Sequence, residues 1–192
     1  MRITFLNQKG GVGKTTIALL IGSVLQKSGG YDVAIDDQDP QDSAKFFSKA
    51  FGLPLLSDNP TAQYIITDTP GHLKLEGATR ERMAKTIEMS DKLILVTEKS
   101  PAAVHSSMAM AELIRDKMSK GAKAYVLFNK VRINTIIGKQ EGKPIAKDFG
   151  LPALKNELPL SAAFETSFVT GLSAVTGEHR SQLLNVALEI LK

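Results

Sequence analysis

The residues with the clearest chemical potential are the eight at positions 9–16, KGGVGKTT, which combine three glycines with two lysines and two threonines. An apolar run at 3–6 precedes them and another at 17–21 follows, so the pattern predicts a strand, a tight turn and the start of a helix. Backbone N–H groups at a helix start lack intrahelical partners and lie at the positive end of the helix dipole. A glycine-rich turn at this place predicts a loop that binds a polyphosphate.

The spacing also assigns roles within this loop. Three glycines allow a close approach of the backbone to phosphate, Lys14 is expected to reach the β and γ phosphates, and the Thr15 hydroxyl is expected to bind Mg²⁺. The expected nucleotide-binding residues of the loop are Lys9, Gly10, Gly11, Val12, Gly13, Lys14, Thr15 and Thr16. The common loop pattern requires glycine at position 8, where Gln8 stands, so this is a variant loop with Lys9 as its extra element.

Carboxylates follow two further apolar runs. Asp36, Asp37 and Asp39 come after the second predicted strand, and Asp68 comes after the third. Because ligands of open parallel sheets bind at the carboxyl ends of the strands, these carboxylates are expected beside the phosphate loop. They would repel a polyphosphate unless Mg²⁺ lies between them, and Asp68 is expected to orient the shell of that ion. The alternative is that the first three only cap the helix that begins near Gln41.

The elements that must position these residues alternate between short β-rich runs and helical patterns. This alternation predicts an α/β fold with a mostly parallel, twisted sheet and helices on both faces. Strands are expected at 2–6, 31–36, 63–67, 92–97 and 124–129, with a weaker one at 153–157. Helices are expected at 13–28, 41–51, 79–89, 102–119, 135–149, 162–172 and 178–191. The length of 192 residues favours a single domain spanning 1–192.

Composition excludes several classes of function. The chain has no cysteine, which excludes disulfides, thiolate metal sites and iron–sulfur ligation by thiolates. No apolar stretch approaches the length of a membrane span, and no signal peptide precedes the first strand, so we expect a soluble, cytoplasmic protein. The histidines match no ligand spacing, and no metal or general-base role is expected of His72, His105 or His179.

Three motifs in order resemble those of the ParA/MinD family of deviant Walker A P-loop ATPases, most closely the small ParA-type partition ATPases. They are KGGVGKTT at 9–16, DQDPQ at 37–41 and the apolar-DTP pattern at 65–70. The resemblance implies a P-loop NTPase fold, hydrolysis of ATP with Mg²⁺, and a homodimer that encloses ATP between its subunits. It also implies association with nonspecific DNA in the nucleoid and a separate ParB-like or centromere-binding adaptor that stimulates slow hydrolysis.

The resemblance further implies roles for single residues. Lys9 matches the signature lysine that crosses to the phosphates of the other subunit, where a cation stabilises the charge of the transferred phosphoryl group. Asp39 matches the residue that positions the attacking water, so the expected catalytic residues are Lys9, Lys14 and Asp39. Asp37 and Asp68 match carboxylates that shape the Mg²⁺ environment, which with Thr15 gives the expected metal site. Asp36 departs from the family pattern, which has an apolar residue there, and is expected to loosen the end of the second strand.

The identity of the base has two readings. The stretch 68–71 also fits the D-x-x-G pattern of GTPases, and Asn129 and Lys130 resemble the start of their base-reading motif. Position 132 is arginine, however, and arginine cannot accept the two N–H donors of guanine. Adenine is therefore favoured, with Asn129 and Pro159 as base contacts implied by the resemblance.

Charge points to a partner. The stretch 120–155 holds eight basic and two acidic residues, a net charge of +6 within a chain of +4. Such a field attracts a polyanion, although a solvated lysine-rich face explains it too. The candidates for nonspecific DNA contact are Lys139, Lys143, Lys147, Lys155 and Arg180. The resemblance implies that the protein partitions or positions a cargo, plasmid or chromosomal DNA or a protein assembly, over nonspecific DNA.

Three alternatives remain. A MinD-like membrane cycle would use an amphipathic C-terminal helix, but the polar face of 180–192 is nearly neutral, which favours a helix packed on the core and no membrane partner. A metabolic ATP-dependent kinase or synthetase on a related fold would need a second substrate pocket. A module that only binds ATP would show no turnover.

Overall fold

The computed structural model describes all residues, 1–192, and is built on one sheet of five parallel strands in the order β2-β3-β1-β4-β5. The strands are β1 (Arg2–Leu6), β2 (Val33–Asp37), β3 (Tyr64–Asp68), β4 (Lys92–Thr97) and β5 (Lys123–Phe128). Each agrees with a predicted strand to within two residues. The predicted α/β class and parallel sheet are confirmed.

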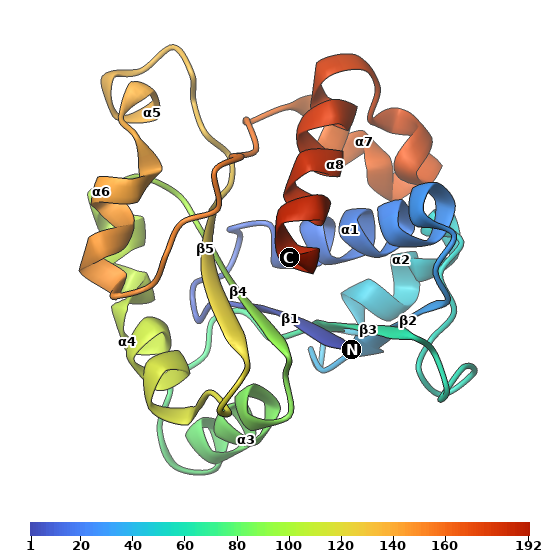
Figure 1. Ribbon diagram of the computed structural model, residues 1–192, viewed down its shortest axis with the longest axis horizontal. Coiled ribbons are helices and arrows are strands. Elements are labelled where there is room, and N and C mark those ends of the chain that lie inside the picture. The colour runs from blue at the N-terminus through green and yellow to red at the C-terminus, as the bar shows by residue number, and fades with distance from the viewer.

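Helices cover both faces of this sheet (Figure 1). One face carries α1 (Lys14–Gly29), α2 (Ser43–Phe51), α7 (Ala162–Thr170) and α8 (Gly177–Leu191). The other face carries α3 (Gly77–Glu88), α4 (Pro101–Lys117) and α6 (Gly142–Ala146). The short α5 (Ile136–Lys139) and the 3₁₀ turns η1 (Lys147–Phe149) and η2 (Gly171–Ala174) complete the chain.

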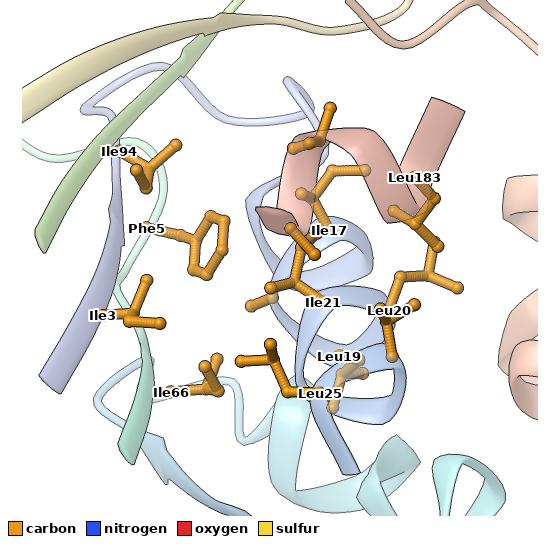
Figure 2. Close-up of a cluster of buried hydrophobic side chains, with 14 of the residues drawn as sticks. Ile3, Phe5, Ile17, Leu19, Leu20, Ile21, Leu25, Ile66, Ile94 and Leu183 are labelled. Carbon is orange, nitrogen blue, oxygen red and sulfur yellow. The ribbon is translucent and has the colours of Figure 1, made fainter. Parts of the chain in front are cut away.

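The side chains of β1 alternate between the two faces. Ile3 and Phe5 pack toward α1, whereas Leu6 belongs to the cluster under α3 and α4. Figure 2 shows Ile3, Phe5, Ile66 and Ile94 directed from the strands toward α1. This alternation fixes the register of β1, and therefore the point where the phosphate loop leaves the sheet.

Helix α1 is apolar on nearly all sides because it packs against the sheet on one side and against α8 on the other. Ile17 and Ile21 face the sheet, and Leu183 of α8 packs on α1 from the other side (Figure 2). The helix ends at Gly30, which takes a left-handed φ of 69° and whose N–H donates to the Gln26 carbonyl. Buried contacts from Ile17 to Leu25 thereby hold the first turn of α1 in position at the cleft.

The prediction that the C-terminal helix packs on the core is confirmed. Leu183, Val186, Ala187 and Ile190 of α8 are buried in the cluster that contains α1. No helix in the structure combines the length and the apolar character that a crossing of the bilayer requires.

Two predicted elements are wrong. Residues 153–157 form no strand, because only one isolated bridge, between Val126 and Ala153, joins them to β5. The single helix expected over 135–149 is divided into α5, α6 and η1. Gln140, whose backbone is extended, ends α5 and separates it from α6, and Gly150, with a left-handed φ of 63°, ends η1.

Candidate nucleotide-binding site

The phosphate loop connects the end of β1 to the start of α1, as the sequence predicts. Gly13 precedes α1 with a left-handed φ of 93°, which favours glycine, and no side chain caps the first turn of the helix. The first N–H groups of α1 therefore have neither an intrahelical acceptor nor a side-chain acceptor. They provide the donors and the positive helix end that an anion requires.

Lys14 is the buried cation of this loop. Its residue surface is only 6% exposed, and burial lowers the pKa of the ammonium group, while the charges of Asp68 and Asp39 oppose that shift. No carboxylate forms an ion pair with Lys14 within 4.0 Å. A buried ammonium group without an ion-pair partner strongly favours binding of an anionic ligand.

Asp68 lies at the end of β3 and is fully buried. Its Oδ2 atom accepts a hydrogen bond from the Thr15 hydroxyl at 2.6 Å, whereas its Oδ1 atom has no partner. Burial raises the pKa of Asp68 to about 7. An unpartnered carboxylate oxygen beside a hydroxyl fits Mg²⁺ or one of its water ligands, because this ion takes hard oxygen ligands.

Asp37 and Asp39, from the same segment, lie in different environments. The Oδ2 of Asp37 accepts from the backbone N–H of Lys45 at 2.8 Å, and its Oδ1 accepts from that of Asp39 at 3.0 Å. Asp37 thus satisfies the first turn of α2, does not line the cleft, and has a pKa that burial raises. Asp39 does line the cleft, and its Oδ1 accepts from the backbone N–H of Gln41 at 3.0 Å.

Asp36 does not loosen the second strand, and that expectation is wrong. Strand β2 continues through Asp37, with Asp36 in register opposite Thr67. The carboxylate of Asp36 forms an ion pair with Arg2 and accepts from Gln38 at 3.0 Å. The family pattern has an apolar residue at this position. The chain tolerates the charge of Asp36 there because Arg2, on β1, neutralises it.

Asn129 and Lys130, just beyond β5, hold the phosphate loop by its backbone. The Asn129 side chain is buried and donates to the carbonyl of Val12 at 2.8 Å. The Lys130 ammonium donates to the carbonyl of Gly11 at 2.7 Å. Together they satisfy two carbonyl oxygens of the loop and connect it to the end of β5.

The loop forms the floor of a cleft of about 820 Å³. Of the predicted site residues, the structure brings to this cleft Gly10, Gly11, Gly13, Lys14, Thr15, Thr16, Asp39, Asn129 and Pro159. Val12 is buried beneath the loop, and Lys9, Asp37 and Asp68 do not line the cleft. Lys9 is half-buried, and its ammonium group forms no hydrogen bond or ion pair within the chain.

Several cleft residues carry no motif that could have revealed them. They are Phe47 of α2, His72, Leu160, Phe164 and Phe168. The phenylalanines of α7 follow helical spacing, which predicts packing rather than a site. His72 stands apart from the other histidines in the sequence, and its proximity to the loop depends on the folded path of residues 70–73.

The site combines a phosphate-binding loop, a hydroxyl–carboxylate pair beside it and an open cleft. Comparison of the sequence with models of known protein families agrees with this geometry. The family model described as the CobQ/CobB/MinD/ParA nucleotide binding domain matches residues 3–174. The chain belongs to this family. The resemblance to ParA/MinD-type ATPases inferred from the three motifs is thereby confirmed.

Individual relatives of this ParA/MinD-type protein are distant in sequence. It is 27% identical over 186 residues to the maintenance of carboxysome distribution protein A of Gloeobacter kilaueensis, covering 89% of this chain and 82% of that protein. Two solved structures share its fold, an ATP complex of an McdA variant from Cyanothece and the pNOB8 ParA bound to nonspecific DNA. The first has a TM-score of 0.73 at 15% identity and covers 99% of this chain and 95% of that chain. The second has a TM-score of 0.68 at 15% identity, covering 99% and 96% respectively.

Proposed function

We propose that this protein is a Mg²⁺-dependent ATPase that dimerises when it binds ATP and positions a DNA or protein cargo over nonspecific DNA. The contrast between the two lysines of the phosphate loop carries the proposal. Neither ammonium group has an ion-pair partner, but Lys14 is buried and lines the cleft, whereas Lys9 is half-buried and does not line it. We infer that Lys14 serves the nucleotide of its own chain and that Lys9 does not.

In this proposal Lys14 and the N–H groups of the α1 first turn hold the phosphates. Thr15 and Asp68 would hold Mg²⁺, which when bound neutralises charge on the phosphate oxygens and stabilises the leaving group. Asp37 acts by capping α2, which keeps Asp39 at the cleft. Asp39 lines the cleft with an Oδ2 atom that accepts no hydrogen bond from the chain, and this oxygen would orient the attacking water.

Lys9 would act on the ATP of the other subunit. A cation supplied across the interface makes hydrolysis depend on dimerisation, as with an arginine finger. The absence of an internal partner for Lys9 supports this role, because an unpaired ammonium group loses no existing contact when it moves to a phosphate on the facing chain.

DNA association is proposed for the basic residues of α5, α6 and η1. Lys139, Lys143 and Lys147 are exposed on consecutive short elements, which lie together at one end of the molecule (Figure 1). Arg180 is a weaker candidate, since its guanidinium donates to the Leu172 carbonyl and the Ser28 hydroxyl, both at 3.2 Å. The relation to a carboxysome distribution protein supports a protein assembly as a second class of cargo beside a plasmid or chromosome.

The test is binding to duplex DNA of arbitrary sequence, measured with ATP, with ADP and without nucleotide across a salt series. We expect binding only with ATP and a fall in affinity with salt, by a log–log slope of about 0.9 for each phosphate neutralised. The double variant Lys139→Glu and Lys143→Glu should abolish it, while Lys27→Glu on α1 serves as a control of equal charge change per site. Binding that persists in the double variant would reject this DNA surface, and absence of ATP hydrolysis by the wild type would reject the ATPase.

A MinD-like membrane cycle receives no support from α8, whose apolar residues Leu183, Val186 and Ile190 are buried against the core. Sedimentation with liposomes in the presence of ATP separates the two proposals. Pelleting of the protein would favour the membrane cycle.

A further inference from the structure

His72 lies in an unusual backbone conformation next to the phosphate loop. It has a left-handed φ of 56°, one of three non-glycine residues in the chain with a positive φ. Such a conformation is uncommon for a residue with a side chain and is held only where the surrounding structure imposes it. Histidine at this position therefore calls for a contact that glycine could not make.

The contact is with Gly10 of the phosphate loop. A Cβ atom built on Gly10 would overlap the imidazole ring, so the ring packs directly against the α-carbon of that glycine. His72 lines the cleft, its side chain is exposed there, and neither ring nitrogen forms a hydrogen bond within the chain. The imidazole thus presents unused hydrogen-bonding capacity at the mouth of the phosphate site.

The backbone of this segment is anchored on both sides. The Thr69 hydroxyl donates to the Phe5 carbonyl at 2.8 Å, and the Leu73 N–H donates to the Gln8 carbonyl at 3.2 Å. Between these anchors, Gly71 comes so close to Lys14 that a Cβ built on it would lie 3.4 Å from the ammonium nitrogen. The segment 69–73 therefore passes over the loop on the side of the lysine that holds phosphate.

We propose that His72 is a nucleotide-binding residue, whose imidazole N–H donates a hydrogen bond to the terminal phosphate of ATP bound on the loop. This inference rests on the proposed function, since it needs ATP in the cleft. It gives the site a donor from the β3–α3 connection that recognises the third phosphate specifically. ADP lacks that phosphate, so His72 would distinguish ATP from ADP.

The test compares ATP and ADP affinities, by calorimetry with Mg²⁺, for the wild type, His72→Asn and His72→Gly. Asparagine and glycine both tolerate a positive φ, so both variants keep the backbone path and remove the imidazole. We expect the Kd for ATP to rise about five- to tenfold in each variant, as for loss of one charge-assisted hydrogen bond, and the Kd for ADP to stay within about twofold. His105→Asn, an exposed histidine of α4, is the matched control and should change neither value.

Equal weakening of ATP and ADP would overturn the assignment, because a purely structural role of His72 affects both nucleotides alike. Unchanged ATP affinity, or tighter ATP binding after removal of the ring, would overturn it as well. If the wild type itself binds neither nucleotide, the proposed function fails and this inference with it. If the wild type binds and hydrolyses ATP and only the selective loss is missing, the proposed function stands and the role of His72 fails.

Discussion

The nucleotide cleft has two walls that are built in different ways. The phosphate wall, formed by residues within 10–16 and 70–73, uses backbone N–H groups and the buried Lys14, and Asp68 lies buried behind it on the Thr15 hydroxyl. The outer wall, residues 159–168, uses largely apolar side chains from a loop and from α7, with Leu160 about half exposed. The first wall can bind charge, and the second offers mainly apolar contact.

The difference is also one of construction. The phosphate wall lies at the ends of the central strands β1 and β3, so its positions follow from strand register and from α1. The outer wall approaches from the C-terminal quarter of the chain, held by a bridge between Val131 and Pro159 and by aromatic contacts of Phe168 with Phe47. We therefore expect the phosphate wall to determine affinity and the outer wall to adjust it.

The largest effect is expected for Lys14→Ala. Removal of the buried ammonium group should weaken both ATP and inorganic tripolyphosphate by roughly 100-fold or more, because the charge acts in a poorly solvated site. Calorimetry with the two ligands measures this, and Lys120→Ala, at an exposed lysine, is the control. A loss confined to ATP would contradict the division between the walls.

A second large effect concerns stability. The pKa of Asp68 is raised by burial from 3.8 to about 7, so the folded state without ligand binds the proton more tightly than the unfolded state does. Below about pH 4 the carboxyl is protonated in both states and does not change the free energy of unfolding. Between about pH 4 and 7 the free energy of unfolding falls as pH rises, and above about pH 7 the loss is complete. Asp68→Asn cannot ionise, and its free energy of unfolding should exceed that of the wild type by about 2–4 kcal/mol at pH 8, with no excess near pH 4.

Urea denaturation without nucleotide at several pH values measures this difference. Asp58→Asn, at an exposed aspartate, should give a difference that is small and independent of pH. Parallel curves for the wild type and Asp68→Asn across the pH range would show that the buried carboxylate carries no such cost. With ATP present, Asp68→Asn should also lose the dependence of binding on Mg²⁺.

An intermediate effect is expected where the chain beyond β5 supports the phosphate wall. Asn129→Ala removes the donor to the buried Val12 carbonyl and should lower the free energy of unfolding by about 1–3 kcal/mol. Lys130→Ala removes a more exposed hydrogen bond, to the Gly11 carbonyl, and should lower the free energy of unfolding by less than about 1 kcal/mol. Thermal and urea unfolding measure both losses. A larger loss in Lys130→Ala than in Asn129→Ala would refute the claim that Asn129 is the main support of the loop.

The smallest effect is expected on the outer wall. Leu160→Ala should weaken ATP by about threefold, because a half-exposed leucine contributes little contact area, and should leave tripolyphosphate unchanged. Competition of ATP with GTP in the same variant tests whether this wall or Asn129 distinguishes the bases. A loss of tripolyphosphate binding would place Leu160 at the phosphates.

The two walls also differ in how far the sequence predicts them. The loop at 9–16 and Asp68 are recognisable because their chemistry requires fixed residue types at fixed spacing next to apolar strands. Phe164, Phe168 and His72 are not, because they reach the cleft through helix packing and through the path of residues 69–73. Asp36 shows the same limit, since its compensating partner Arg2 is distant in sequence and adjacent only in the sheet.

The helix expected over 135–149 failed for a related reason. Gly138, Gly142 and Pro144 weaken a continuous helix here, and the Lys99 ammonium group, buried just beyond β4, donates to the carbonyls of Gly138 and Gln140 and pairs with Glu157 at 2.7 Å. These two carbonyls accept hydrogen bonds from Lys99 instead of from the backbone N–H groups that would continue the helix. Local propensity does not reveal such a contact.

The central claim is that Lys9 completes the site of the facing subunit, and phosphate release from mixed variants tests it most directly. Lys9→Ala should bind ATP within about threefold of the wild type yet hydrolyse it at least about tenfold more slowly. Asp39→Ala should likewise bind ATP and be inactive. In an equimolar mixture half of the dimers pair one chain of each kind, and each such dimer has one complete site, so we predict about a quarter of the wild-type rate. A mixture no more active than the two variants measured separately would contradict the claim.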